Sequence, residues 1–389
     1  MASGGPKTAL ILTGGGARAA YQVGVLAAIR DLLSDPQRNP FPIICGTSAG
    51  AINAAHLAAT AEDFGTGVGQ LLDIWRSFHA GDVYRADALG IGLTAANWLT
   101  AFAAGWLLKK SPGALLDNTP LRQLVERHID FSGIDRAIAN RALHSVSITC
   151  SGYSSGHSVS FFQGRPDLEP WLRATRFGAH VKLGVDHLMA SSAIPFIFPA
   201  VKLHREYFGD GSMRQVAPIS PAIHLGADKI LVVGAGRSSA PDVAREHSAA
   251  YPSLAQIAGH VLSSIFLDSL YVDIERATRI NHTVSLIPEQ VRQQQGMSLR
   301  PIEVLVISPS ERLDQLAAHH AHSLPGPVRL LLRGIGAMNR HGGALTSYLL
   351  FEAAYTRALI DLGRRDTLAR RDEVLAFLET KHQKTVTST

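Results

Sequence analysis

The residues with the clearest chemical potential lie in the pentapeptide Gly46-Thr47-Ser48-Ala49-Gly50. An apolar run, Pro42–Cys45, precedes it, and an alanine-rich stretch typical of a helix, Ala51–Ala59, follows it. A strand, a sharp Gly-x-Ser-x-Gly turn and a helix form a nucleophile elbow, which exposes the serine beside a helix N-terminus. The pattern therefore predicts Ser48 as a nucleophile, in a turn too tight for larger residues at its two glycines. The alternative is an ordinary strand-to-helix turn in which the serine only caps the helix.

A second residue of interest is Asp210, which lies between two glycines in Phe208-Gly209-Asp210-Gly211-Ser212. We expect a short strand over Val201–Tyr207, just before it. A tight turn at a strand end projects this short carboxylate away from the sheet. The same residues also suit an ordinary Asx turn, in which the carboxylate binds only its own backbone.

A glycine loop near the N-terminus, Thr13-Gly14-Gly15-Gly16-Ala17-Arg18, joins a predicted strand over Thr8–Leu12 to a helix. Glycines at a helix start leave backbone N–H groups accessible, which suits either a dinucleotide pyrophosphate or the oxyanion of an acyl transfer. Gly14-x-Gly16-x-x-Ala19 fits the relaxed dinucleotide fingerprint, but such a site needs an acidic residue at the end of the next strand. That strand ends in the serine motif instead, which favours an oxyanion hole formed by Gly14, Gly15, Gly16 and Ala17.

The order strand, loop, helix, strand defines a βαβ unit and predicts a mainly parallel sheet. Further strands are predicted at 143–151, 157–162, 229–234, 284–287 and 302–307. Further helices are predicted at 62–80, 118–128, 186–192, 218–228 and 347–363, the last one ending at Gly363 as its C-terminal stop. The polar segment Pro288–Arg300 is expected to be a loop.

Composition limits the class of protein. The 389 residues are 46% hydrophobic and 18% charged, which excludes disorder of the whole fold. Cys45 and Cys150 lie in apolar runs and are expected to be buried free thiols in a reducing compartment. We recognise no secretory signal, so a cytoplasmic protein is expected. The net charge of +5 is spread along the chain, which predicts no nucleic-acid partner and leaves weak attraction to an anionic membrane as an option.

One long stretch, 88–108, has no charged residue and is followed by Lys109-Lys110. Its length would allow a membrane span, but glycines, threonines and an asparagine dilute it. A single span would also place Ser48 and everything after Lys110 on opposite sides of a bilayer. We therefore expect an apolar cap or interfacial helix, with a buried core helix as the alternative.

Taken together, these motifs resemble those of the patatin-like phospholipase family. The resemblance rests on the glycine loop 14–18, the elbow 46–50, Asp210-Gly211-Ser212, and the segment Ala190–Phe196 before it, and it covers roughly residues 7–235. Ala19 and Ser212 depart from the usual glycine and glycine-or-alanine of the family, but neither change removes a catalytic group. The resemblance implies a three-layer α/β/α sandwich with a mainly parallel sheet. The expected organisation is a catalytic domain at 7–310, a C-terminal helical region at 311–383 and a disordered tail at 384–389.

The resemblance also implies a serine lipid acyl hydrolase that acts on phospholipids or other acyl-ester lipids with peripheral membrane contact. Ser48 would be the nucleophile and Asp210 its base, in a dyad without histidine, and Arg18 would brace the glycine loop. Gly46, Gly50 and Gly211 would support the turns at Ser48 and Asp210. Neither a cofactor nor a metal is expected. The alternatives are a non-catalytic lipid-binding or scaffold protein on the same fold, and an α/β-hydrolase whose catalytic histidine comes late in the chain, from His319, His320, His322 or His341.

Overall fold

The computed structural model describes residues 6–85, 114–236, 253–265, 269–297, 299–334, 336–338 and 343–379. The apolar segment 88–108, Lys109-Lys110, His341 and the tail 384–389 lie outside the described residues. The strands are β1 (Thr8–Leu12), β2 (Ile43–Thr47), β3 (Ser145–Gly152), β4 (Ser158–Gly164), β5 (Trp171–Leu172), β6 (Arg176–His180), β7 (Val201–Leu203), β8 (Glu206–Asp210), β9 (Lys229–Val233) and β10 (Glu303–Ile307).

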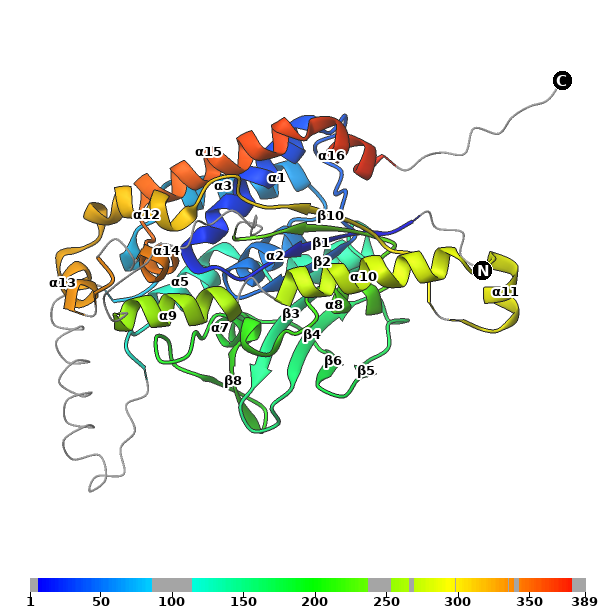
Figure 1. Ribbon diagram of the computed structural model, residues 1–389, viewed down its shortest axis with the longest axis horizontal. Helices are drawn as coiled ribbons and strands as arrows, with labels where there is room; N and C mark the ends of the chain where they lie inside the picture. Colours follow the sequence, from blue (N-terminus) through cyan, green and yellow to red (C-terminus); the bar gives the residue numbers. More distant parts are fainter. Residues whose placement is uncertain are drawn as a thin grey trace, which may run out of the picture.

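Helices surround these strands on both sides (Figure 1). The α-helices of the first half are α1 (Ala20–Leu32), α2 (Ala49–Ala59), α3 (Phe64–Arg76), α5 (Thr119–His128), α6 (Ser132–Ala139), α7 (Val185–Ser191) and α8 (Ser220–His224). Those of the second half are α9 (Leu254–Ser263), α10 (Ser269–Ser285), α11 (Glu289–Gln294), α12 (Leu313–His320), α13 (Gly326–Gly334), α14 (Gly343–Leu349), α15 (Ala353–Ala369) and α16 (Arg371–Leu378). Short 3-10 helices include η1 (Gly16–Ala19) and η3 (Gly211–Arg214).

The described strands form one sheet in the order β10-β9-β1-β2-β3-β4-β6-β5. The five strands from β10 to β3 run parallel to one another, and β4 is antiparallel to β3. The hairpin β7–β8 adds to the sheet where β8 runs antiparallel to the end of β3. The parallel centre places the carboxyl ends of β1, β2 and β3 at one edge of the sheet, where ligands bind in open α/β sheets.

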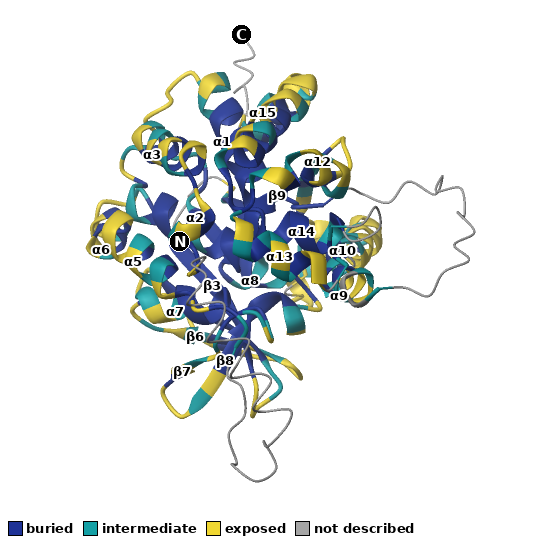
Figure 2. Ribbon diagram, turned by 90° about the vertical axis from the view of Figure 1, so that its left-hand side faces the viewer, coloured by how far each residue is buried: buried dark blue, intermediate teal, exposed yellow. Residues whose placement is uncertain are grey.

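Two apolar layers separate the sheet from its helices. Leu10 and Leu12 of β1 belong to a large cluster with α1, α2, α3 and α15, whereas Ala9 and Ile11 belong to a second cluster with α8 and α10. This alternation arises because successive side chains of a strand point to opposite faces. The central strands are buried on both sides (Figure 2), and the predicted three-layer α/β/α architecture with a mostly parallel sheet is confirmed.

Helix α15, in the C-terminal part of the chain, packs closely along α1, which is the helix of the first βαβ unit (Figure 1). A methyl group on Gly24 of α1 would overlap the backbone of Ile360, and one on Gly363 of α15 would overlap the backbone of Tyr21. The prediction that Gly363 ends its helix is therefore wrong. Gly363 lies inside α15, where its missing side chain lets the two helix backbones approach.

Gly24→Ala is expected to lower the free energy of unfolding by about 2 kcal/mol, because overpacking at a helix contact costs more than the gain in helix propensity. The matched control is Gly69→Ala in α3, where an added methyl group meets no atom within 4 Å. That change should raise stability by about 0.5–1 kcal/mol. Urea denaturation of both variants checks the pair. Equal effects at the two sites would show that the contact between α1 and α15 is not tight.

Four predicted elements differ from the structure. The single helix predicted at 347–363 is divided between two helices, since α14 ends at Leu349 and α15 begins at Ala353. The predicted strand at 284–287 is wrong: it covers the end of α10, whose buried residues Leu270, Asp273, Ala277 and Val284 recur at helical spacing. The segment 201–207 contains a turn and forms the hairpin β7–β8 instead of one strand. The segment 288–300, expected to be a loop, contains α11.

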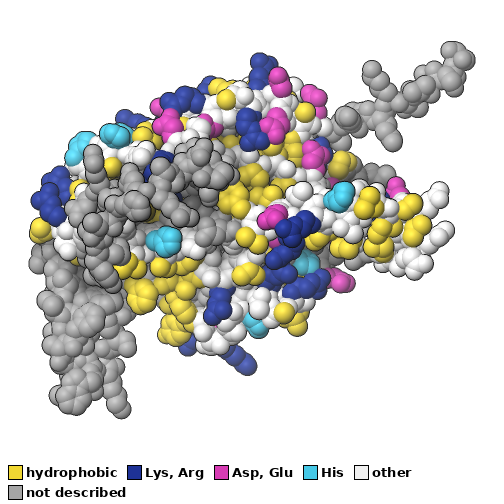
Figure 3. All heavy atoms as spheres, viewed as in Figure 1, with side chains coloured by type: hydrophobic (Ala, Val, Ile, Leu, Met, Phe, Trp, Pro, Cys, Tyr) yellow, Lys and Arg dark blue, Asp and Glu magenta, His cyan; other side chains and the backbone are white. Residues whose placement is uncertain are grey.

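Two further observations concern the class of protein. Cys45 and Cys150 are both buried and free, as predicted. No helix within the described ranges is both long and apolar enough to cross a membrane. Basic and acidic side chains are interspersed on the face shown in Figure 3, where hydrophobic side chains also gather at its lower left.

Candidate active site

Ser48 lies at the carboxyl end of β2 in a strained backbone conformation, with φ 56° and ψ −132°. Positive φ is unfavourable for residues other than glycine, and such strain concentrates at functional sites. A methyl group on Gly46 would overlap α2, and one on Gly50 would overlap the carbonyls of Leu12 and Thr13. The two glycines thus let α2 fold back over β2 and pack against the end of β1. The Ser48 side chain makes no capping hydrogen bond to α2, so the simple N-cap interpretation does not explain the residue.

Ser191 of α7 fixes this turn, a role that the sequence motif did not indicate. The backbone N–H of Ser48 donates to Ser191 Oγ at 2.9 Å, and the Ser191 hydroxyl donates to the Thr149 carbonyl at 2.6 Å. Ser48 is only 1% exposed. The strained serine is therefore tied to β3 through one buried hydroxyl group.

Asp210 is the last residue of β8, and the pairing of β8 with β3 places it near Ser48. Thr47, just before the serine, is paired with Thr149 of β3, and Asp210 is paired with the next residue, Cys150. A methyl group on Gly211 would overlap the Thr149 carbonyl, so glycine is required for this close approach. The two predicted residues, distant in sequence, thus lie at one end of β3.

The two oxygens of Asp210 have different environments. Oδ1 accepts a hydrogen bond from the Ser212 backbone N–H at 2.9 Å, which forms the predicted Asx turn. Oδ2 is buried and has no partner of regular geometry among the described residues. Burial raises the pKa of Asp210 to about 6, and hydrogen bonding by the Ser48 hydroxyl and by Ser212 only partly offsets this effect. The Ser48 hydroxyl is thus near the carboxylate but not aligned with it, and Oδ2 is free to accept a proton.

The glycine loop follows β1 and enters η1. Gly16 has φ 55°, and a methyl group there would overlap the carbonyl of Tyr348. Within the described parts of the chain, the backbone N–H groups of Gly14, Gly15, Gly16 and Ala17 donate to no acceptor. Gly16 lines the same pocket as Ser48. Free N–H groups beside a nucleophile are the arrangement that an oxyanion hole requires.

Arg18 connects this loop to α14. Its Nε and Nη2 donate to Ser347 Oγ at 2.8 and 2.6 Å, and its Nη1 donates to the Tyr348 hydroxyl at 3.1 Å. The guanidinium carbon also lies 4.0 Å from the centre of the Tyr348 ring. The buried arginine therefore holds the glycine loop against a helix more than 300 residues later in the chain.

Arg18→Lys is expected to lower kcat about tenfold with a small change in KM, because lysine cannot replace the forked contact with Ser347 and Tyr348. Arg357→Lys is a suitable control, since Arg357 is exposed and donates a hydrogen bond to the Arg76 carbonyl. Steady-state kinetics on an acyl ester would distinguish the two variants. An unchanged kcat in Arg18→Lys would contradict a role of this contact in positioning the loop.

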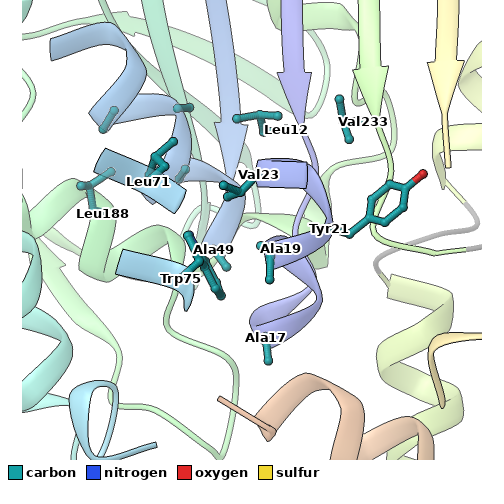
Figure 4. Packing of buried hydrophobic residues seen from close by; sticks show 14 of the residues in the cluster. Leu12, Ala17, Ala19, Tyr21, Val23, Ala49, Leu71, Trp75, Leu188 and Val233 are labelled. Atoms are coloured by element: carbon teal, nitrogen blue, oxygen red, sulfur yellow. The ribbon is translucent and has the colours of Figure 1, made fainter. Parts of the chain in front are cut away.

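An apolar pocket leads from Ser48 between α2, α3 and α5. Ala49 of α2 and Trp75 of α3, both labelled in Figure 4, are among its lining residues. Its lining residues are Gly16, Ser48, Ala49, Ile52, Asn53, His56, Leu71, Ile74, Trp75, Phe78, Val83, Leu121, Leu124, Val125, His128, Ile129, Ser192, Ile194, Phe198 and Phe351. The motifs did not indicate α3 and α5, because a pocket wall requires only apolar residues and these resemble any helix core.

His319, His320 and His322 are not among the residues that line this pocket. His319 and His322 are exposed and bind carbonyls of their own segment, and His320 lies 6.2 Å from the ring of Tyr355. No group of three or more His, Cys, Asp or Glu side chains that could hold a metal occurs in the described portion of the chain.

Residues 10–223 match the family model of the patatin-like phospholipases, which covers more than half of the chain. The chain therefore belongs to the patatin-like phospholipase family. It is 27% identical over 209 residues to a cGAMP-activated phospholipase of Pseudomonas aeruginosa (strain BWHPSA011 / Pa011). The match covers 54% of this chain and 53% of that relative, so the chain spans about half the length of the curated relative.

Two solved structures show weak overall similarity. VipD from Legionella pneumophila has a TM-score of 0.34 and 12% identity, with 92% of this chain and 67% of that chain covered. The type III effector protein ExoU has a TM-score of 0.29 and 16% identity, with 96% of this chain and 88% of that chain covered.

Proposed function

We propose that this protein is a serine lipid acyl hydrolase of the phospholipase A or lysophospholipase type, acting through a dyad of Ser48 and Asp210. The observation that carries the proposal is the pairing of a strained, buried serine with a carboxylate that has one unpartnered oxygen. The raised pKa of Asp210 supports a basic role, since a general base works best when its pKa lies near the working pH. Family membership supports the same chemistry.

In the proposed reaction, Ser48 Oγ attacks the ester carbonyl while its proton passes to Asp210 Oδ2. The N–H groups of Gly14–Ala17 stabilise the tetrahedral oxyanion, and each such donor is typically worth about 3–4 kcal/mol. The carbon–oxygen bond to the alcohol then breaks, and Asp210 returns the proton to the leaving alcohol. Water finally attacks the acyl group on Ser48 and gives its proton to Asp210, which passes it to Ser48 Oγ as the fatty acid leaves.

The pocket supports a fatty-acyl substrate. Most of its lining side chains are apolar, and Ser48 is among its lining residues. Burial of an acyl chain there is favourable by roughly 0.8 kcal/mol per methylene group. A polar or charged acyl group would instead lose its hydration without compensation. The exposed side chain of Phe196, two residues after the pocket residue Ile194, supports peripheral contact with a lipid surface.

The test is the release of fatty acid from vesicles of mixed phospholipids by the purified protein, followed by mass spectrometry. Ser48→Ala is the inactive control, and Ser154→Ala, at an exposed serine, is the matched surface control. We expect release by the wild type and by Ser154→Ala only. Equal release by Ser48→Ala would contradict the proposed nucleophile, and binding to vesicles without release by any form would favour a lipid-binding scaffold.

The pH dependence follows from Asp210. Because the base must be ionised and its pKa is about 6, kcat/KM should rise with pH and level off above about pH 7. The midpoint of this rise should lie near pH 6. Initial rates on a neutral ester between pH 4.5 and 8.5 check this expectation, within the range where the protein stays folded. A midpoint near 4 would contradict a buried base.

A further inference from the structure

Two polar side chains of the pocket between α2, α3 and α5 differ in how they are satisfied. Both polar atoms of the Asn53 side chain have hydrogen-bond partners. Its Oδ1 accepts from Trp75 Nε1 at 2.9 Å and its Nδ2 donates to Gln22 Oε1 at 3.1 Å. His56, three residues later, is only 3% exposed, and its Nε2 is buried without a partner of regular geometry in the described residues. Among the residues that line this mostly apolar pocket, His56 Nε2 and Ser192 Oγ are the two buried side-chain groups left without such a partner in the described residues.

The position of His56 along the pocket is fixed by α2. Ile52 and His56 are four residues apart on one face of α2, Ser48 directly precedes this helix, and all three line the pocket. Eight residues of an α-helix span about 12 Å. An extended hydrocarbon with C–C bonds of about 1.5 Å advances about 1.25 Å per carbon, so His56 lies about ten carbons from the ester.

An unsubstituted hydrocarbon chain at that position would offer no hydrogen bond to the buried His56 Nε2. Burying a polar group without a hydrogen bond is unfavourable, and a ligand group that supplies the bond removes this cost. Burial lowers the pKa of His56, and the charge of His128 acts in the same direction, whereas contacts with the backbones of His128 and Gly67 and with the Gln70 side chain act against it. The ring is therefore neutral at neutral pH and recognises an uncharged donor or acceptor.

We propose that His56 selects acyl chains that carry a hydroxyl or similar uncharged oxygen about ten carbons from the ester bond. This inference rests on the proposed acyl hydrolase function. It names a substrate class, oxygenated fatty-acyl lipids, and a residue that determines specificity without taking part in the chemical step. A lipid with an unsubstituted chain remains a substrate, but a poorer one.

The test is a competition between two phosphatidylcholines in vesicles of one carrier lipid, one with octadecanoyl and one with 10-hydroxyoctadecanoyl chains. The ratio of the released acids gives the ratio of kcat/KM. For the wild type we expect the hydroxylated chain to be favoured about tenfold. In His56→Leu the ratio should fall to one or below, with faster hydrolysis of the unsubstituted chain, and His56→Gln should keep part of the preference because it retains hydrogen-bonding groups. Lipids hydroxylated at carbon 4 or carbon 16 serve as controls and should show no preference.

The same ratio in the wild type and in His56→Leu, or a preference that does not depend on the hydroxyl position, would overturn the inference. If the wild type hydrolyses none of these lipids, the proposed function fails. In that case, the binding of 10-hydroxyoctadecanoate and octadecanoate is measured by the fluorescence of Trp75, which lines the pocket. Tighter binding of the hydroxylated acid by the wild type alone would support the role of His56, and equal binding would refute it.

Discussion

Asp210→Asn is expected to reduce hydrolysis by about 10³–10⁴-fold while making the folded protein more stable at neutral pH. The activity falls because asparagine cannot accept the proton of Ser48, and general-base catalysis alone contributes about 10²–10⁴-fold. The fold should persist, because the amide oxygen can still accept the hydrogen bond from the Ser212 N–H that holds the turn.

The stability change follows from the pKa of Asp210, which rises from 3.8 to about 6 on folding. The folded state therefore binds this proton more tightly than the unfolded state. Its stabilising effect is complete below pH 4 and is lost as the pH rises through about 6. The shift of about 2 pKa units corresponds to about 3 kcal/mol. Asp210→Asn removes the titration, so its free energy of unfolding should exceed that of the wild type by up to about 3 kcal/mol at pH 8.

Urea denaturation of both proteins at pH 4 and pH 8 measures this difference. The other titrating groups cancel when the variant is compared with the wild type at the same pH. We expect near-equal stability at pH 4 and the larger gap at pH 8. A gap that does not change with pH would show that burial does not perturb this carboxylate. A variant that retains activity would remove Asp210 from the mechanism.

Ser48→Ala should lower kcat by about 10⁴–10⁶-fold, as expected when a catalytic nucleophile is deleted. Affinity for lipid vesicles should be preserved, because the apolar pocket is unchanged. Ser48→Gly should be equally inactive but about 1 kcal/mol more stable than Ser48→Ala, because glycine adopts the positive φ of this turn without strain. Thermal denaturation and initial rates for both variants check these expectations. Equal stability of the two would mean that the turn is not strained.

Much of this architecture could be predicted from local sequence. The glycine loop, the serine elbow and the Asp-Gly turn each combine a strand end with residues that only a tight turn tolerates. Alternating and continuous apolar runs indicated β1, β2, β3, β4 and β9. Where local patterns were ambiguous, the predictions failed: the short β-branched run at 284–287 ends a helix, and Gly363 lies within α15 because its backbone contacts α1.

The remaining parts of the site depend on contacts that no local pattern reveals. Ser191 reaches Ser48 across 143 residues, and Ser347 reaches Arg18 across 329 residues. Ser191 lies in the segment Ala190–Phe196, but neither serine's sequence context indicates its partner, and only the sheet order and the packing of α14 bring the two serines to the turns that they hold. Likewise, His56 resembles a core residue of α2 until the pocket beside it is known.

The most direct test of the dyad is covalent labelling of Ser48 by a fluorophosphonate, followed by intact mass measurement and peptide mapping. We predict one adduct on the wild-type protein, located at Ser48. Labelling of Asp210→Asn should be at least about 10²-fold slower, and His320→Ala should label at the wild-type rate. An adduct on another residue, or equally fast labelling of Asp210→Asn, would contradict the proposed active site.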